Sequence, residues 1–299
     1  MNVVVFGAGS LGSLLGGLLA REHAVTLVGR DPHMETVRAE GLRITGAVEE
    51  TVYPEARTDP PAEADLALVC VKAFDTPKAA DALADVDLDC CLSVQNGMGN
   101  ENLLAERLDV PVLAGTCTYG ALSSTPGVVR CTGIGEVVLG AREGGHSAAA
   151  ETVGEAFESA DIVTAVAEDM PRRLWEKLAV NAGINATTAL ARVDNGALLD
   201  GDANAVATAA GREVARVARA EGVDLSQAEA ERAVERVAEA TADNTSSMQQ
   251  DVLAERRTEV DAIGGYVLER ADERGIDVPV NATMTRLLRA WESGQGFRP

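Results

Sequence analysis

Lysine is almost missing from this chain of 299 residues, and positive charge is scarce altogether. Lys72, Lys78 and Lys177 are its only lysines; the other 23 of the 26 cations are arginine, set against 47 acidic residues and a net charge of -21. The acidic excess runs through the whole chain, which argues against nucleic acid as a partner. It is typical of a halophilic protein, although high-GC codon usage gives the same arginine bias.

Long hydrophobic runs are also missing. The longest apolar stretch near the start, residues 8–20, is interrupted by glycines and is too short to cross a bilayer. Met1-Asn2 lacks the basic flank of a signal peptide. We therefore expect a cytoplasmic, unprocessed protein with no membrane partner, long enough for two domains.

No C-x-x-C motif occurs, and no histidine stands in a recognisable pairing with a cysteine. The cysteines, mostly within apolar strand-like runs, are Cys70, Cys90, Cys91, Cys117 and Cys131. We expect reduced and mostly buried thiols, with no metal site and no catalytic cysteine.

The first half of the chain alternates short β-branched runs with helical patterns, which predicts a parallel sheet with crossover helices. The expected strands are Val3–Phe6, Ala24–Val28, Leu66–Val71, Cys91–Val94 and Val110–Ala114. Val128–Cys131 and Glu136–Leu139 flank a glycine turn and predict an antiparallel hairpin that finishes the sheet, with Ile162–Ala165 as a last strand.

Helical periodicity dominates from Met170-Pro171 onward. The expected helices are Arg172–Ala191, Ala203–Glu221, Gln227–Ala242, Ser247–Arg256, Glu259–Arg274 and Pro279–Ser293. We predict an α/β fold, with a Rossmann-type doubly wound sheet in residues 1–167 and an all-helical domain in residues 168–299.

A glycine-rich turn follows the first strand and opens a helix. Its residues are Gly7, Ala8, Gly9, Ser10, Leu11 and Gly12, a G-x-G-x-x-G motif in its strand and helix context. Gly7 permits the tight turn, Gly9 lets the backbone approach a pyrophosphate, and Gly12 lets helix and strand pack. The motif predicts a dinucleotide cofactor.

Arg30 stands near the end of the second strand, where an NAD-specific fold usually carries Asp or Glu. An arginine there pairs with a 2′-phosphate, which favours NADPH. Asp31, one residue later, leaves NADH open as the alternative.

Two polar residues follow other strands of the predicted sheet. Lys72 comes after the third expected strand and Asn96 after the fourth, and ligands of such sheets bind beyond the carboxyl ends of the strands. We expect both side chains at one crevice, although Asn96-Gly97 on its own is also a common turn.

The stretch WEKLAVNAGINATTAL, residues 175–190, places Lys177, Asn181 and Asn185 four residues apart in an otherwise apolar helix. Residues at this spacing share one face of a helix. Asparagine is a poor helix former, and an exposed face of this acidic protein would carry Glu, Asp or Arg. We expect the row to line a polar cavity between the domains, where Lys177 donates a proton and the asparagines hold a small polar ligand.

The sequence resembles the ketopantoate reductase (2-dehydropantoate 2-reductase) family over nearly its whole length. The motifs that carry the resemblance are FGAGSLG at 6–12, VKAFDT at 71–76, QNGMGNE at 95–101, WEKLAVNAGINATTAL with Asp194-Asn195-Gly196, and NTSSMQQD with RRTEVDAIGG at 256–265. It implies a helical domain similar to the C-terminal domain of 6-phosphogluconate dehydrogenase.

The resemblance also implies roles for particular residues. Lys177 resembles the family's general acid, and Glu259 the glutamate that contacts the substrate. Lys72 and Asn96 match residues between cofactor and substrate. The remaining matches to substrate-binding residues are Asn181, Asn185, Asn195, Asn244 and Ser247.

Two positions depart from the family pattern. Ile263-Gly264-Gly265 stands where many relatives carry Ile-Asn-Gly, and Ala186 where some carry proline. We expect the first change to leave catalysis intact.

The resemblance implies NADPH-dependent reduction of 2-dehydropantoate to (R)-pantoate for coenzyme A biosynthesis. The partner is thus a small-molecule substrate, and a homodimer is the assembly considered. Asn244 and Ser247, at the start of a helix, would bind the substrate carboxylate. Two alternatives stay open: a reductase of another branched 2-keto acid, and a non-catalytic protein that senses NADP(H).

Overall fold

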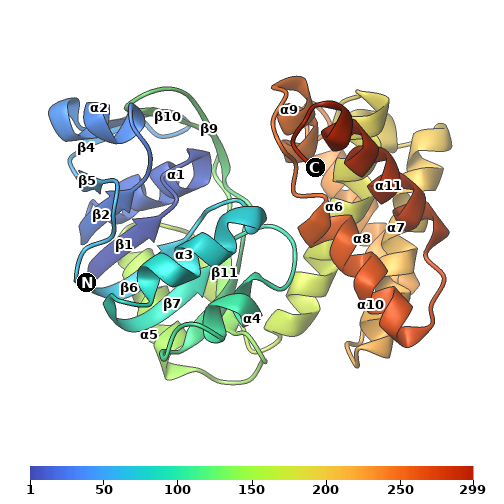
Figure 1. Ribbon diagram of the computed structural model, residues 1–299, viewed down its shortest axis with the longest axis horizontal. Coiled ribbons are helices and arrows are strands. Elements are labelled where there is room, and N and C mark those ends of the chain that lie inside the picture. The colour runs from blue at the N-terminus through green and yellow to red at the C-terminus, as the bar shows by residue number, and fades with distance from the viewer. Residues whose placement is uncertain (299) are drawn as a thin grey trace. The chain divides into compact units, whose positions relative to one another are not determined.

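The computed structural model describes residues 1–298, apart from the side chain of Ser124. The chain divides into two compact units (Figure 1). The first holds residues 1–95 and 100–170, and the second holds residues 96–99 and the chain from Pro171 onward. The short segment 96–99 thus belongs with the helical unit, although sequence places it within residues 1–167.

An eight-stranded sheet forms the first unit, in the order β12-β11-β8-β7-β6-β1-β2-β5. Its strands are β1 (Asn2–Phe6), β2 (Ala24–Val28), β5 (Glu55–Arg57), β6 (Glu63–Val69), β7 (Asp87–Ser93), β8 (Val112–Cys117), β11 (Val137–Ala141) and β12 (Thr164–Val166). All neighbouring pairs are parallel except β8 with β11. The strand order reverses at β1, which makes the carboxyl ends of β1 and β6 the expected ligand site.

Helices cover both faces of this sheet, as the doubly wound prediction requires. They are α1 (Ser10–Leu19), α2 (His33–Glu40), α3 (Thr76–Leu83), α4 (Asn100–Ala105) and α5 (Ala148–Ser159), with a short 3₁₀ turn η1 (Ala73–Asp75). On one face Leu15 of α1 and Phe157 of α5 pack in one apolar cluster with Val5. On the other, Leu83 of α3 packs in a second cluster with Val4. Because alternate residues of β1 point to opposite faces, both clusters draw on the same strand.

Four further strands form a second sheet, in the order β4-β3-β10-β9. They are β3 (Leu42–Gly46), β4 (Glu50–Val52), β9 (Gly120–Thr125) and β10 (Val128–Gly133). The hairpin predicted between Val128–Cys131 and Glu136–Leu139 is wrong, because β10 pairs with β9 and β3 while β11 pairs with β8 and β12. Val129 and Cys131 are buried as their alternation predicts. Alternation fixes which face is buried and leaves the pairing partner open.

Helices make up the second unit (Figure 1). They are α6 (Met170–Ala191), α7 (Gly201–Ala220), α8 (Gln227–Ala240), α9 (Ser247–Leu253), α10 (Tyr266–Arg274) and α11 (Pro279–Gly294), with a 3₁₀ turn η2 (Asn195–Leu198) and a π-helical turn η3 (Asp261–Gly265). The single helix predicted over Glu259–Arg274 is therefore interrupted by a π turn at its start. In the described part of the chain, no helix is both long and apolar enough to span a membrane.

Candidate functional site

The glycine turn between β1 and α1 is fixed by close backbone contacts. The N–H groups of Gly7 and Ala8 donate to the carbonyl of Val28 at 3.0 and 2.9 Å. Gly7 has a φ of +107°, and a Cβ there would lie 2.7 Å from the backbone nitrogen of Val71. A Cβ at Gly12 would lie 2.2 Å from the carbonyl oxygen of Gly7. The turn itself therefore requires glycine at both positions.

Gly9 has a different environment. A Cβ added there would meet no atom within 4 Å, and the residue is exposed. Gly9 is also the N-cap of α1, and no side chain caps this end of the helix. The first N–H groups of a helix lack partners within the helix, and together with the helix dipole they attract anions. Residues 7–12 therefore fit the pyrophosphate of a dinucleotide.

His33 and Ser13 support the glycine turn through hydrogen bonds, and sequence analysis identified neither residue. The N–H of Gly127 donates to Nδ1 of His33 at 2.9 Å, so the proton of the neutral ring sits on Nε2. Nε2 lies 3.0 Å from the hydroxyl of Ser13, which donates to the carbonyl of Ala8 at 3.2 Å. Burial lowers the pKa of His33 and keeps the ring neutral. This chain of bonds ties the turn to the loop between β9 and β10.

Arg30 and Asp31 are both exposed and follow β2 in the first unit, beyond Gly29. Within residues 1–298, the side chain of Arg30 makes no described hydrogen bond or ion pair. Lys72 is half-buried and is the N-cap of η1. It stands three residues after the end of β6 at Val69. These positions leave Arg30 and Lys72 in the first unit, at the carboxyl ends of two strands that flank β1.

The five cysteines, all among the described residues of this unit, form no disulfide, and Cys90, Cys91 and Cys131 are buried. Burial raises the pKa of the Cys70 and Cys91 thiols, and that of Cys90 to about 11. Thiols of this kind are poor nucleophiles at neutral pH.

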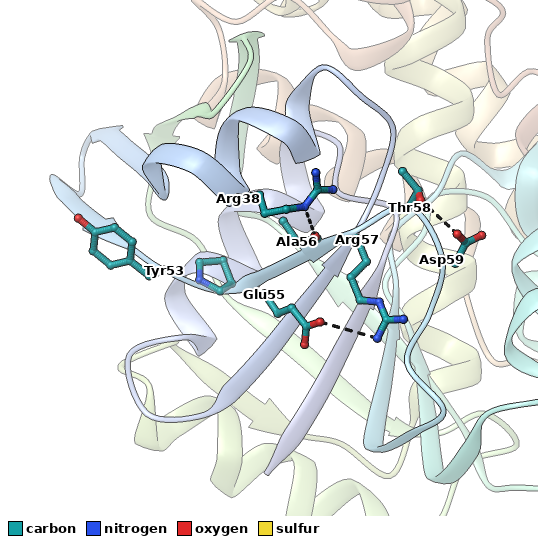
Figure 2. A pocket seen from close by; sticks show the side chains of 8 residues that line it. Arg38, Tyr53, Glu55, Ala56, Arg57, Thr58 and Asp59 are labelled. Carbon is teal, nitrogen blue, oxygen red and sulfur yellow. Dashed lines mark hydrogen bonds and ion pairs between the residues drawn. The ribbon is translucent and has the colours of Figure 1, made fainter.

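An open hollow of about 740 Å³ lies along the edge strand β5 (Figure 2). It is lined by Arg38, Tyr53, Pro54, Glu55, Ala56, Arg57, Thr58 and Asp59. Nε of Arg38 donates to the carbonyl of Ala56 at 3.0 Å, and Arg57 pairs with Glu55 at 3.7 Å. Charged side chains on a sheet edge discourage pairing with another chain. The hollow contains none of the predicted site residues, and we interpret it as a protected edge.

The predicted row on α6 is present in the second unit. Lys177 and Asn181 are half-buried, and Asn185 is 6% exposed. The helix around them is closely packed, since a Cβ at Gly183 would lie 2.6 Å from the carbonyl oxygen of Ala207 on α7. None of the three polar residues is turned fully to solvent, as the sequence argument requires.

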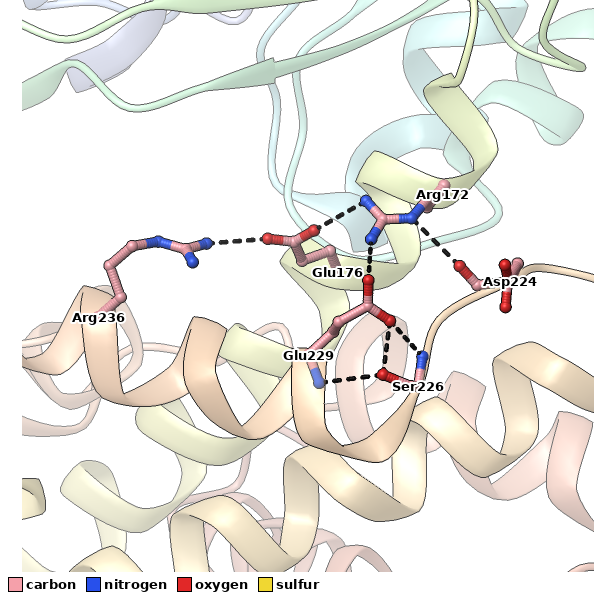
Figure 3. A network of polar contacts seen from close by, with 6 residues as sticks. All are labelled: Arg172, Glu176, Asp224, Ser226, Glu229 and Arg236. Atoms are coloured by element: carbon pink, nitrogen blue, oxygen red, sulfur yellow. Dashed lines mark hydrogen bonds and ion pairs between the residues drawn. The ribbon is translucent and has the colours of Figure 1, made fainter.

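Glu176 precedes this row and forms ion pairs within the helical unit (Figure 3). Its carboxylate accepts from Arg172 at 3.3 Å and from Arg236 at 2.9 Å. Arg172 also donates to Glu229 at 2.8 Å, and Glu229 closes a capping box with Ser226 at the start of α8. These ion pairs connect α6 to α8 in the helical unit.

Residues 96–99 bring Asn96 to Glu259. The amide of Asn96 donates to the carboxylate of Glu259 at 3.4 Å. The N–H of Met98 donates to the carbonyl of Ala262 at 3.0 Å, and the side chain of Met98 packs against the apolar core of the helical unit. A Cβ at Gly97 would lie 2.5 Å from the Cβ of Ala262, so only glycine fits between them. Two residues that sequence analysis placed in separate domains thus make direct contact.

Two of the expected substrate residues, Asn195 and Asn244, are joined by a hydrogen bond. The N–H of Asn195 donates to the carbonyl of Asn244 at 3.1 Å, and its side-chain amide donates to Thr241 at 2.8 Å. The side-chain oxygen of Asn195 is buried and has no partner among the described residues.

Ser246, which sequence analysis passed over, organises the start of α9. Its hydroxyl accepts from the N–H of Gln249 at 3.2 Å and lies 2.7 Å from the hydroxyl of Thr188 on α6. The spacing of Ser246 and Gln249 is that of a capping-box signature and could have identified this N-cap. Ser246 thus satisfies one N–H group at the start of α9, and the side chains of Asn244 and Ser247 on either side of it are exposed.

The departure from the family pattern at Gly264 has a packing reason. A Cβ there would lie 2.1 Å from the hydroxyl oxygen of Thr285 on α11. Glycine at 264 therefore lets the π turn approach α11 more closely than a larger residue would allow. The carboxylate of Glu259, one turn earlier, keeps its contact with Asn96. Ala186, the other departure, is buried in α6, and nothing in the structure explains it.

A doubly wound sheet with an open glycine turn, joined in one chain to a helical unit with a lysine-asparagine row, defines a class of dinucleotide-dependent dehydrogenases. Two family models match this chain. The one described as "Ketopantoate reductase PanE/ApbA" matches residues 3–144, and the one described as "Ketopantoate reductase PanE/ApbA C terminal" matches residues 169–292. Together they cover most of both units, so the chain belongs to the ketopantoate reductase family.

Individual relatives agree with this assignment. A 2-dehydropantoate 2-reductase of Halobacterium salinarum is 46% identical over 97% of this chain and 98% of its own length. One of Archaeoglobus fulgidus is 39% identical over 98% of each chain. The crystal structure of a PanE/ApbA family ketopantoate reductase from Ralstonia eutropha has a TM-score of 0.91 and 34% identity, covering 99% of this chain and 100% of that one. The expected halophilic character agrees with the acidic composition and the Halobacterium relative.

A more distant structure shows the fold alone. D-mandelate dehydrogenase, solved with NADH and anilino(oxo)acetate, is 23% identical with a TM-score of 0.92 and covers 99% of each chain. The architecture is therefore shared with an enzyme whose structure contains a nicotinamide cofactor.

Proposed function

We propose that this protein reduces 2-dehydropantoate to (R)-pantoate with NADPH, in coenzyme A biosynthesis in the cytoplasm. The observation that carries the proposal is the half-buried Lys177 with Asn181 and Asn185 along α6, in a member of the ketopantoate reductase family. A homodimer remains a prediction.

Each unit has its own part in this reaction. Residues 7–12 at the start of α1 hold the pyrophosphate, and Arg30 pairs with the 2′-phosphate. When bound, the reduced nicotinamide supplies a hydride. In the helical unit, Asn181, Asn185 and Asn195 orient the keto acid through hydrogen bonds, and the exposed Asn244 and Ser247 bind its carboxylate.

Lys177 supplies the proton. Hydride addition at a ketone carbon leaves negative charge on the oxygen, and an ammonium group beside it stabilises the charge and then donates the proton. The carboxylate of Glu259 accepts a hydrogen bond from the substrate hydroxyl and a second one from the amide of Asn96. Lys72 completes the contacts between cofactor and substrate.

The proton-donor role is tested with Lys177→Ala. We expect kcat to fall by about 10² to 10⁴-fold, the usual worth of general acid assistance, with NADPH affinity unchanged. Lys78→Ala is the matched control, since Lys78 is exposed on α3 and pairs only with Asp75 among the described residues. Undiminished turnover in Lys177→Ala would refute the assignment.

The substrate is tested by following NADPH oxidation with ketopantoate, 2-oxoisovalerate and pyruvate. A strong preference for ketopantoate supports the proposed substrate. Equal rates with ketopantoate and 2-oxoisovalerate, with pyruvate slower, favour reduction of branched 2-keto acids in general, and NADPH binding without turnover favours a sensor.

The cofactor preference is tested with Arg30→Ala. We expect the KM for NADPH to rise by about tenfold or more, with little effect on NADH, because a hydrogen-bonded charge pair is lost. Arg57→Ala is the control, since Arg57 ends the neighbouring strand and pairs with Glu55. An equal rise for both nucleotides contradicts recognition of the 2′-phosphate.

A further inference from the structure

Glu292, near the end of α11, is a charged residue that the proposed mechanism does not use. Its side chain is fully buried, with 0% of the residue exposed. Burial of a carboxylate is costly unless hydrogen bonds and an opposite charge compensate it. The hydrogen-bond partners of Glu292 therefore indicate its structural role.

Those partners flank Glu259. One oxygen of Glu292 accepts from the N–H of Thr258 at 2.8 Å and from its hydroxyl at 2.6 Å. The Thr258 hydroxyl in turn accepts from the N–H of Val260 at 3.3 Å. The residues before and after Glu259 are thus both tied, directly or through one hydroxyl, to a single buried carboxylate.

The tail of the chain completes the arrangement. Nε of Arg298 donates to the second oxygen of Glu292, and its Nη2 pairs with Asp261. Arg289 of α11 also pairs with Asp261 at 2.8 Å. Thr258 and Asp261 are therefore held by α11 and Arg298, Val260 is held by the Thr258 hydroxyl, and Glu259 lies between them.

We infer that Glu292 is a positioning residue, which acts through Thr258 and Arg298 to aim the carboxylate of Glu259 at the substrate and at Asn96. The inference rests on the proposed function. Thr258, Val260 and Glu259 are at most 6% exposed, so water has little access to replace these hydrogen bonds if they are lost, and the backbone beside Glu259 would then shift. The direction of the Glu259 side chain is set by backbone atoms that Glu292 holds.

The first test uses Thr258→Val, which removes the hydroxyl and keeps the shape, and Thr258→Ser, which keeps the hydroxyl. We expect the valine variant to raise the KM for ketopantoate by about tenfold or more, as for one lost hydrogen bond to a charged group. Its kcat should change less than its KM, and its KM for NADPH should stay at the wild-type value. Thr258→Ser should restore the wild-type KM for ketopantoate.

Glu292→Gln and Arg298→Ala extend the test to the other two residues of the proposed positioning contacts. Glutamine still accepts from Thr258 but has no charge to pair with Arg298, so we expect a smaller rise in KM. Arg274→Ala is the matched control, because it breaks an ion pair with Glu221 elsewhere in the helical unit. A general loss of stability would lower the melting temperature in any of these variants without a selective effect on the keto acid.

A wild-type KM for ketopantoate in folded Thr258→Val overturns the inference. Crystal structures of wild type and Thr258→Val give a readout that needs no turnover. We expect the Asn96–Glu259 contact to be lost in the variant; if it is unchanged, the inference fails. Failure of wild-type protein to reduce any keto acid counts against the proposed function alone.

Discussion

Two of the three glycines of the turn, Gly9 and Gly12, should respond differently to the same substitution. A methyl group at Gly12 would lie 2.2 Å from the carbonyl oxygen of Gly7, which is backbone and has no room to move. We expect Gly12→Ala to lower the free energy of unfolding by about 3 kcal/mol, the upper end of the range for overpacking. A methyl group at Gly9 would meet nothing within 4 Å.

Gly9→Ala should therefore fold normally and bind nucleotide poorly. An alanine N-cap costs about 1 kcal/mol, and the reduced entropy of the unfolded chain offsets a similar amount. The new methyl would occupy the approach of the pyrophosphate and weaken a hydrogen bond to a charged group, about 1.5–3 kcal/mol. That energy corresponds to a rise in the Kd for NADPH of about 10- to 150-fold.

Thermal unfolding without nucleotide and calorimetric titration with NADPH separate the two effects. Wild-type affinity in Gly9→Ala would show that the pyrophosphate does not approach this turn. Wild-type stability in Gly12→Ala would contradict the packing argument.

Two further predictions concern the helical unit. Gly183→Ala should lower the free energy of unfolding by about 1–3 kcal/mol, since its Cβ would lie 2.6 Å from the Ala207 carbonyl oxygen. Gly211→Ala should stay within about 1 kcal/mol of wild type, because its Cβ would lie 3.0 Å from a side-chain methyl group. Urea unfolding measures both, and equal losses would count against the argument. Bonds from the hydroxyl and N–H of Ser226, with Arg172, lower the pKa of Glu229 to about 2, so its contribution to stability is complete above its unfolded pKa of about 4.5 and is lost as pH falls toward 2. The melting temperature of Glu229→Gln should accordingly lie below that of wild type at pH 6 and converge with it near pH 2; a constant difference would refute this.

Local sequence predicted the glycine turn and four central strands of the first unit. The glycine turn and the strands β1, β2, β6 and β7 follow from short-range patterns, because turn geometry and strand alternation involve neighbouring residues. The second sheet did not follow. Residues 42–52 form β3 and β4, and β3 pairs with β10 more than 80 positions later. Such a pairing has no local signature.

The helical half was predicted in its elements and only partly in its contacts. The row of Lys177, Asn181 and Asn185 follows from helical periodicity alone. The capping serine at 246 also had a local signature. The contact of Asn96 with Glu259 joins residues 163 positions apart, through a glycine that alone fits against Ala262.

The glycine turn, the helical second half and the lysine-asparagine row can each be found from the order of nearby residues. The side chains that support them depend on contacts between distant parts of the chain. Glu292 has the sequence signature of a surface glutamate in the last turn of a helix, yet it is fully buried against Thr258. The reason is that burial of a charge depends on partners brought from distant parts of the chain, and no local pattern encodes them.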